Sequence, residues 1–247
     1  MPLQTIEPRR LYRQIADQLR ALIERGEVAP GARLPPERDL ALQLGVSRPS
    51  VREALIALEV EGRVEVRMGS GVYALPPERA RPRAVSAESP LETIRARALI
   101  ESALAAQAAL QMRKAQVAGL RNAVALMRQE VASGHSAARG DRLFHLRIAE
   151  AADNPVLERI VGELYDERHN PLGEQFVSHF ESAHSWAAAI AEHEAVIDAI
   201  ASRSPEAARA AMTTHLANSH GRFTASISAA ARVPGAPARR RPARKAA

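Results

Sequence analysis

Cysteine is absent from this chain of 247 residues, which excludes disulfide bonds and thiolate metal sites. A small secreted protein held together by disulfides is therefore ruled out. Aromatic residues make up only 3% of the chain, so its cores must be built mainly from Leu, Ile, Val and Ala on helices. No apolar run is long enough for a signal peptide or a membrane span, and we expect a soluble cytoplasmic protein without a membrane partner.

The net charge of +6 comes from one end of the chain. Residues 232–247 hold six of the 34 basic residues and no acid, which leaves 28 basic and 28 acidic side chains elsewhere. Overall basicity therefore does not identify a partner. The composition of residues 231–247 predicts a disordered tail that solubilises the protein or adds weak, sequence-independent attraction to phosphates.

A segment rich in Pro and Arg divides the chain. Residues 76–90 lack apolar periodicity and are predicted to be a linker. The linker separates residues 1–75 from residues 91–230, and the length of the chain fits two domains.

The first domain has the pattern of a winged helix-turn-helix. Apolar residues at helical spacing predict one helix up to Gly26, a second over residues 37–44 and a third that begins at the N-cap Ser47. Val64 and Val66 then alternate with charged residues before a Gly-Ser-Gly turn, which predicts a hairpin. The hairpin would form the wing.

In such a fold the second helix of the motif enters the major groove of DNA. Ser47, Arg48 and Ser50 lie in its first turn, and Arg52 is expected on the same face as Arg48 because the two are four residues apart. Arginine reads guanine or clamps phosphate, while serine hydroxyls suit phosphate oxygens. Arg38, at the start of the preceding helix, is placed to reach the flanking backbone. An ordinary solvated helix face is the alternative, but the order of helix, turn, capped helix and hairpin favours DNA binding.

The run GARLPPERDLALQLGVSRPSVREALIALEVEG, residues 31–62, resembles the winged-helix domain of the GntR family of bacterial transcription regulators. Two departures stand out: Pro36 occupies a position where a small capping residue is usual, and Arg63 one where an apolar residue is common. Pro36 can still open a helix, so we expect DNA binding to be retained. The resemblance implies that operator DNA is touched by Arg38, Ser47, Arg48, Ser50, Arg52 and the wing residue Gly69.

After the linker the whole sequence has helical periodicity. Several amphipathic helices joined by short loops can bury their apolar stripes only against one another, which predicts an all-α antiparallel bundle. The predicted fold class is thus mostly α, with an N-terminal winged helix-turn-helix and a C-terminal helical bundle. Helices are expected near residues 91–113, 115–133, 138–152, 155–168, 183–202 and 205–229.

Three histidines and an aspartate are predicted to point into this bundle. Asp141 and His145 are four residues apart on one helix face, and His193 and His215 lie on the apolar stripes of two other helices. A lone histidine on such a stripe is more often a core residue than a ligand. Four buried polar groups would each need a partner, however, and one divalent cation satisfies all of them. Zn²⁺ fits this donor set best, with Ni²⁺ and Mn²⁺ as alternatives.

These residues belong to motifs that resemble the FCD ligand-binding domain of the FadR subfamily. There the positions matching Asp141, His145, His193 and His215 are metal ligands, and the cation helps to hold a small carboxylate effector. The resemblance also implies that Arg97 reaches toward the effector, although a helix-surface ion pair with Glu101 explains Arg97 nearly as well. The motifs are D-x-x-F-H at 141–145, ADNP at 152–155, EHEAVIDAI at 192–200, MTTHL at 212–216 and RARALIESALAA at 95–106.

The expected function is control of transcription by a homodimer, by preference a repressor, that binds a pseudo-palindromic operator and responds to an organic acid. One alternative is a metal-dependent enzyme that acts on carboxylates and is fused to a DNA-binding domain. We expect no enzyme, because no separate general base is visible and Glu192 and Glu194 should project away from His193. A second alternative is a metal-free architectural DNA binder with a helical dimerisation bundle.

Overall fold

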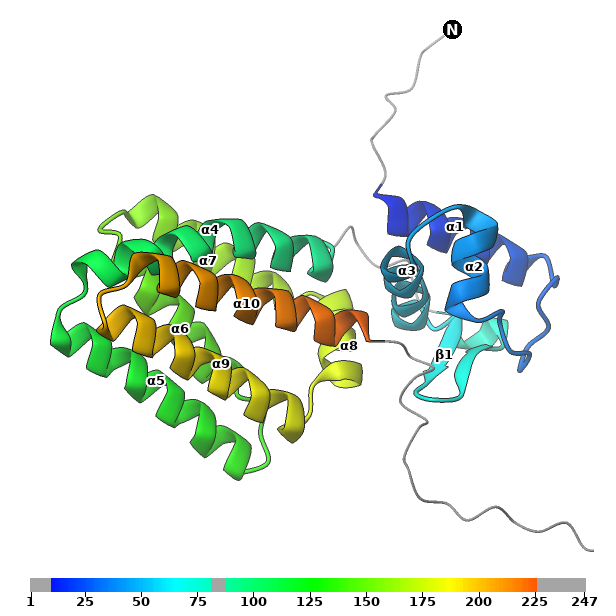
Figure 1. Ribbon diagram of the computed structural model, residues 1–247. Coiled ribbons are helices and arrows are strands. Elements are labelled where there is room, and N and C mark those ends of the chain that lie inside the picture. The colour runs from blue at the N-terminus through cyan, green and yellow to red at the C-terminus, as the bar shows by residue number, and fades with distance from the viewer. Residues whose placement is uncertain (1–9, 81–87, 226–247) are drawn as a thin grey trace, which may run out of the picture.

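The structure is a computed structural model, which describes residues 10–80 and 88–225. The predicted tail, residues 231–247, lies outside the described residues. An N-terminal unit of helices with a small hairpin lies at one end of a larger helical bundle (Figure 1). The predicted fold class, mostly α with a winged helix-turn-helix followed by a helical bundle, is confirmed.

The N-terminal unit is a winged helix-turn-helix. Gly45 ends the second helix in the left-handed conformation, with φ of 66°. The Ser47 hydroxyl then accepts a hydrogen bond from the N–H of Ser50 at 3.3 Å and caps the next helix. Pro36 stands at the N-cap of the second helix, so this departure from the family pattern does not prevent a helix from starting there. The elements are α1 (Leu11–Glu24), α2 (Glu37–Leu44), α3 (Arg48–Val60), β1 (Val64–Arg67) and β2 (Gly71–Ala74).

The wing is the antiparallel pair of β1 and β2. Val64 lies opposite Ala74 and Val66 lies opposite Val72, so the apolar side chains of both strands share one face. That face is buried against the helices, and the turn at its far end contains Gly69 with a positive φ of 75°.

The C-terminal unit is an all-helical bundle. Figure 1 shows α10 running along α4 and α9, and α5 along α6 and α9. Alanine is frequent in the buried core, which lets neighbouring helices approach closely. The helices are α4 (Pro90–Gln111), α5 (Lys114–Ala132), α6 (Ala138–Glu150), α7 (Pro155–Asp166), α8 (Pro171–Phe180), α9 (Ala183–Ala201) and α10 (Pro205–Thr224).

Each of the six predicted segments of the bundle forms a helix over most of its described residues, and residues 226–229 of the last segment lie outside the described residues. The helix α8 was not predicted. In α8 the side chain of Asn170 accepts a hydrogen bond from the N–H of Gly173 at 2.8 Å, and Pro171 occupies the first position. Two short 3₁₀ turns also form: Pro77–Arg79 lies inside the predicted linker, and Glu167–His169 replaces the end of the helix predicted over residues 155–168.

An apolar contact joins the two units. Leu91, Ile94, Leu172, Phe176 and Phe223 of the helical unit belong to the same buried cluster as the core of the winged helix. The helical domain therefore packs directly on the DNA-binding domain. Across residues 10–80 and 88–225, none of the helices has the length and apolarity needed to cross a membrane.

Candidate metal centre and DNA-binding surface

The four residues predicted as metal ligands come together inside the bundle. Asp141 and His145 project from α6, His193 from α9 and His215 from α10, and all four are buried. Each offers one ligand atom, and these atoms lie within 4.8 Å of one another. Helices from distant parts of the sequence thus assemble one compact donor set.

Hydrogen bonds fix which nitrogen of two rings faces this donor set. Nδ1 of His193 lies 2.7 Å from the carbonyl oxygen of Ala189, and Nδ1 of His215 lies 2.9 Å from the carboxylate of Glu192. Both partners are acceptors, so each Nδ1 must be the donor. The opposite nitrogen, Nε2, is left with a free lone pair, as in histidines that ligate metals.

The third ring faces a carboxylate with its Nδ1, without a hydrogen bond to it. Nδ1 of His145 contacts the buried carboxylate of Glu101, while Nε2 of His145 lies 3.4 Å from Nε2 of His193. The two Nε2 atoms lie 3.6 and 3.1 Å from the same oxygen of Asp141. Two facing lone pairs repel each other, so this arrangement favours a positive charge between them, either a proton or a metal ion.

The charges of the cluster suit a cation. Burial alone would raise the pKa of Asp141, but the His145 and His193 rings beside its carboxylate hold it well below its usual range. Burial and the neighbouring His193 lower the pKa of His215 to about 3. Burial alone would lower the pKa of His145, but the carboxylate of Glu101 raises it overall. At neutral pH the cluster therefore holds an ionised Asp141 and a neutral His215, which can ligate a cation directly, whereas the raised pKa of His145 means that metal binding would displace a proton there.

The second oxygen of Asp141 is held by two residues that the sequence reading missed. The hydroxyl of Tyr165 donates to it at 2.7 Å, and Nη1 of Arg168 donates to it at 3.1 Å. Arg168 also contacts Glu181. Arg168 and Tyr165 lie outside the motifs quoted above, so only the folded structure brings them to the cluster.

Arg97 lies beside the cluster and not on the helix surface. It is buried with Glu101, and its Nε donates to that carboxylate at 2.6 Å. Nη2 of Arg97 is buried and has no hydrogen-bond partner among the described residues. A buried guanidinium nitrogen without a partner is costly, and an anion would satisfy it.

A cavity of about 40 Å³ connects these groups. It is lined by the two cluster residues Asp141 and His215 and by the three arginines Arg97, Arg168 and Arg222. Aromatic side chains, including Trp186, form another part of its wall. The space holds on the order of three water molecules.

The predicted DNA-binding residues are mostly open to solvent. Ser47 and Arg48 are exposed at the start of α3, and the Ser47 hydroxyl lies 2.8 Å from that of Ser50. The Arg38 side chain is 79% exposed at the start of α2. Gly69 is half-buried at the turn of the wing.

Arg52 differs from the prediction. It was expected to share an open face with Arg48, but the residue is only 1% exposed. Its Nε and Nη2 donate to the two carboxylate oxygens of Glu37 at 3.0 and 2.6 Å, and its Nη1 donates to the carbonyl oxygen of Phe223 at 3.3 Å. The four-residue spacing was correct, but it does not reveal what packs on that part of the helix.

Comparison with known proteins decides the family. Residues 11–74 match the family described as bacterial regulatory proteins, gntR family, and residues 92–218 match the FCD domain. The chain belongs to the GntR family. The Uxu operon transcriptional regulator of Escherichia coli K12 is 36% identical over 218 residues, which cover 85% of each chain. The Exu regulon transcriptional regulator of the same strain is 37% identical over 228 residues, covering 87% of this chain and 85% of the relative.

A solved structure agrees with the fold. McbR/YncC of E. coli, 22% identical, matches with a TM-score of 0.50 over 87% of this chain and 97% of its own. Since its family members and relatives are transcription regulators, this GntR-family chain is a DNA-binding transcriptional regulator and not an enzyme. The enzyme alternative raised by the metal-type cluster is thereby not supported.

Proposed function

We propose that this regulator is a homodimeric repressor whose affinity for its operator depends on a small carboxylate bound beside a divalent metal ion in the helical domain. One observation carries the proposal: Asp141 and His215 of the donor cluster line the same cavity as Arg97 and Arg168. A carboxylate in that cavity would meet a metal on one side and guanidinium groups on the other.

Asp141, His145, His193 and His215 would hold the metal. Their number, their burial and the inward direction of Nε2 fit Zn²⁺ best, and Ni²⁺ and Mn²⁺ are the alternatives. A bound cation would supply a positive centre with a coordination position open to a carboxylate oxygen.

Arg97 and Arg168 would orient the effector. Nη2 of Arg97 lacks a hydrogen-bond partner among the described residues, so it is the first donor available to an anion. Arg168 already donates to Asp141 and would link the effector to the ligand set. The cavity volume of about 40 Å³ limits a fitting effector to a small acid unless the wall moves.

On the DNA side, we propose contacts from Arg38, Ser47, Arg48, Ser50 and Gly69, all of which are at least partly exposed. Two copies of α3 in a homodimer would occupy two half-sites of a pseudo-palindromic operator. A protein that binds bacterial operator DNA would act in the cytoplasm, where that DNA lies. Repression is the simpler action, because occupying the operator is sufficient, whereas activation needs a contact with RNA polymerase.

Metal content tests the centre. We expect about one divalent ion per chain by elemental analysis of protein purified without a histidine tag, and its loss in His215→Ala. His184→Ala is the matched control, because His184 is exposed on the neighbouring helix and should keep the ion. A parent protein that takes up no ion even when Zn²⁺, Ni²⁺ and Mn²⁺ are supplied would overturn the metal-dependent function.

Effector binding is tested separately with a panel of small carboxylates in a thermal-shift assay on metal-loaded protein. We expect at least one acid to stabilise the parent and to change its affinity for operator DNA. Arg168→Gln should keep the metal and lose most of this response, because only the guanidinium is removed. An equal response in Arg168→Gln would contradict the proposed position of the effector.

A further inference from the structure

Arg52 is held between Glu37 of its own domain and the end of the helical domain. All three nitrogen atoms of its guanidinium donate hydrogen bonds: two reach Glu37 in the same domain, and Nη1 reaches the carbonyl oxygen of Phe223 at the end of α10. The guanidinium carbon also lies 5.9 Å from the centre of the Phe180 ring, at the end of α8. With 1% exposure, this side chain cannot reach a phosphate or a base edge.

The two residues of the helical domain that contact Arg52 also line the effector cavity. Phe180 and Phe223 are part of the cavity wall, and their ring centres lie 6.2 Å apart. On the same helix as Phe223, His215 lies eight residues earlier, or about 12 Å along the axis. Phe180 and Phe223 thus contact the proposed effector cavity on one side and Arg52 on the other.

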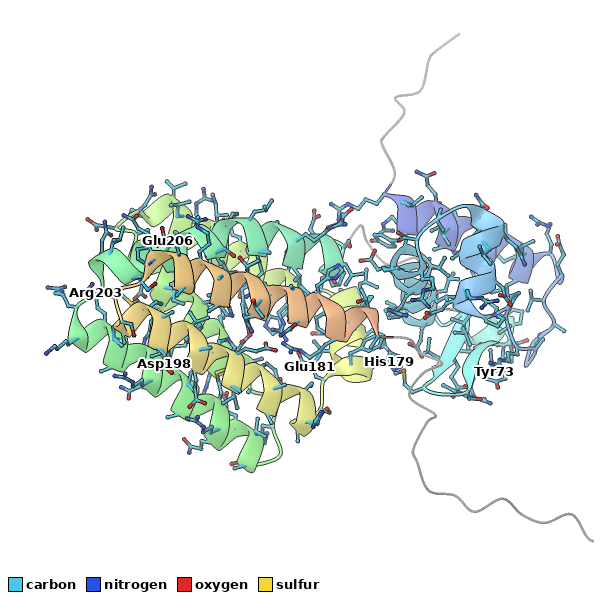
Figure 2. All side chains as sticks on the ribbon, viewed as in Figure 1. Tyr73, His179, Glu181, Asp198, Arg203 and Glu206 are labelled. Atoms are coloured by element: carbon cyan, nitrogen blue, oxygen red, sulfur yellow. The ribbon has the colours of Figure 1, made fainter. Side chains whose placement is uncertain are left out.

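The contact with Arg52 is part of a larger interface between the domains. His179, which Figure 2 shows at the junction of the two domains, places Nε2 2.6 Å from a carboxylate oxygen of Glu59 in α3. Gln175 donates to the same oxygen at 3.0 Å. Both residues belong to α8, the helix that ends at Phe180. Residues near the ends of α8 and α10 therefore contact α3, the helix whose first turn is proposed to bind DNA.

We propose that the helical domain, together with the Glu37 pair, keeps Arg52 from DNA, so that the described conformation is an autoinhibited state in which Glu37, Phe180 and Phe223 compete with DNA for this side chain. Arg52 lies one turn after the exposed Arg48 on α3, so its release would add a second guanidinium beside the first. The inference rests on the proposed DNA-binding role of α3 and adds that the helical domain lowers the affinity of α3 for DNA.

A double-mutant cycle on operator affinity tests this competition. The probe is a duplex that the wild-type chain selects from a random library, and no effector is added. Phe180→Ala removes the ring beside Arg52 and should tighten binding about two- to tenfold, the range expected for a cation–π contact and its ordering effect. Arg52→Ala should weaken binding. The double variant should bind like Arg52→Ala alone, because Phe180 acts through Arg52.

The cycle separates the competing explanations. No gain in Phe180→Ala, or a gain that persists in the double variant, would overturn the autoinhibited state.

Arg48→Ala tests the DNA-binding surface itself. If Arg48→Ala leaves operator affinity unchanged, the proposed DNA-binding surface is wrong, whatever the result for Phe180→Ala. Phe180→Leu keeps most of the apolar volume, so it repeats the test should Phe180→Ala lower the unfolding temperature. Arg52→Lys replaces Arg52→Ala if binding by the latter is too weak to measure.

A second readout needs no DNA. Because the chain contains no cysteine, spin labels attach only at Leu42→Cys on α2 and Leu99→Cys on α4, positions that are 73% and 81% exposed. We expect one narrow distance distribution in the otherwise wild-type protein and a broader or shifted one when Phe180→Ala is added. An identical distribution would mean that Phe180 does not hold the two domains together and would count against the proposal.

Discussion

Glu192 accepts a hydrogen bond at 2.9 Å from Nδ1 of His215, and so turns the other nitrogen of that ring toward Asp141, His145 and His193. Arg222 and Asn218 donate to the same carboxylate. Burial alone would raise the pKa of Glu192, but the hydrogen bonds from His215 and Arg222 lower it to about 2. From the sequence, Glu192 was expected to project away from His193; in the structure it contacts His215 of the next helix and orients that ring.

Removal of this orienting carboxylate should weaken metal binding. We expect Glu192→Ala to bind Zn²⁺ about 10- to 100-fold more weakly than the parent, because such partners fix the tautomer and the direction of a ligating histidine. Competition with a chromophoric chelator gives the affinity. Glu194→Ala is the matched control, since Glu194 is exposed two residues away and contacts Arg128 instead. Equal affinities in the two variants would show that Glu192 does not orient a ligand.

Metal removal should destabilise the helical domain. A ligand at 100 times its dissociation constant adds about 2.7 kcal/mol to stability. For a domain of this size that corresponds to a Tm shift of about 5–10 °C. We therefore expect Zn²⁺ to raise the Tm of chelator-treated parent protein by this amount and to leave His193→Ala unchanged. A similar shift in both proteins would place the stabilising ion elsewhere.

Asp141, His145, His193 and His215 were predictable from the sequence because helical periodicity is a local signal. Each lies on an apolar stripe, and a stripe must face the core whatever the detailed packing. The sequence does not tell which stripes meet, and the structure supplies that, with the four ligand atoms within 4.8 Å of one another.

Arg52 and Arg168 show where the sequence pattern is insufficient. The partners of Arg52 lie 15 and 171 residues away in the chain, so the helical spacing that relates it to Arg48 carries no information about them. Arg168 lies at the end of the segment predicted as a helix over residues 155–168, where the structure has a short 3₁₀ turn before the unpredicted α8. Contacts made by irregular segments between distant elements depend on tertiary packing rather than on local periodicity.

Arg48 should contribute to DNA binding through a direct contact. Arg48→Ala is expected to cost about 1–3 kcal/mol of operator affinity, and a reduced dependence of affinity on salt would assign the contact to phosphate rather than to a base edge. Fluorescence anisotropy at several salt concentrations measures both. Arg128→Ala serves as the control, because its side chain is about half exposed on α5, away from the winged helix, and its loss should change neither quantity.

Glu53 gives a prediction about pH. This residue of α3 is 6% exposed and accepts hydrogen bonds from the Ser89 hydroxyl and from the N–H of Leu91, at the junction of the two domains. Burial raises its pKa from 4.5 to about 7, although both hydrogen bonds act in the opposite direction. The folded protein therefore holds this proton at pH values where the unfolded chain has lost it.

The sign of the effect follows from linkage. Between pH 4.5 and about 7 the unfolded chain binds fewer protons at this site than the folded one, so the contribution of Glu53 to stability falls as pH rises through this window. Above about pH 7 the carboxyl is ionised in both states, so the loss of stability no longer grows with pH.

The free energy of unfolding of Glu53→Gln should therefore rise relative to that of the parent between pH 4.5 and 7, by at most about 3 kcal/mol, and the difference should stay constant above pH 7. Urea unfolding at a series of pH values measures this difference, with the exposed Glu92→Gln as the control. If the difference between Glu53→Gln and the parent is the same at pH 5 and pH 8, the carboxyl of Glu53 is already ionised in the folded protein throughout this range.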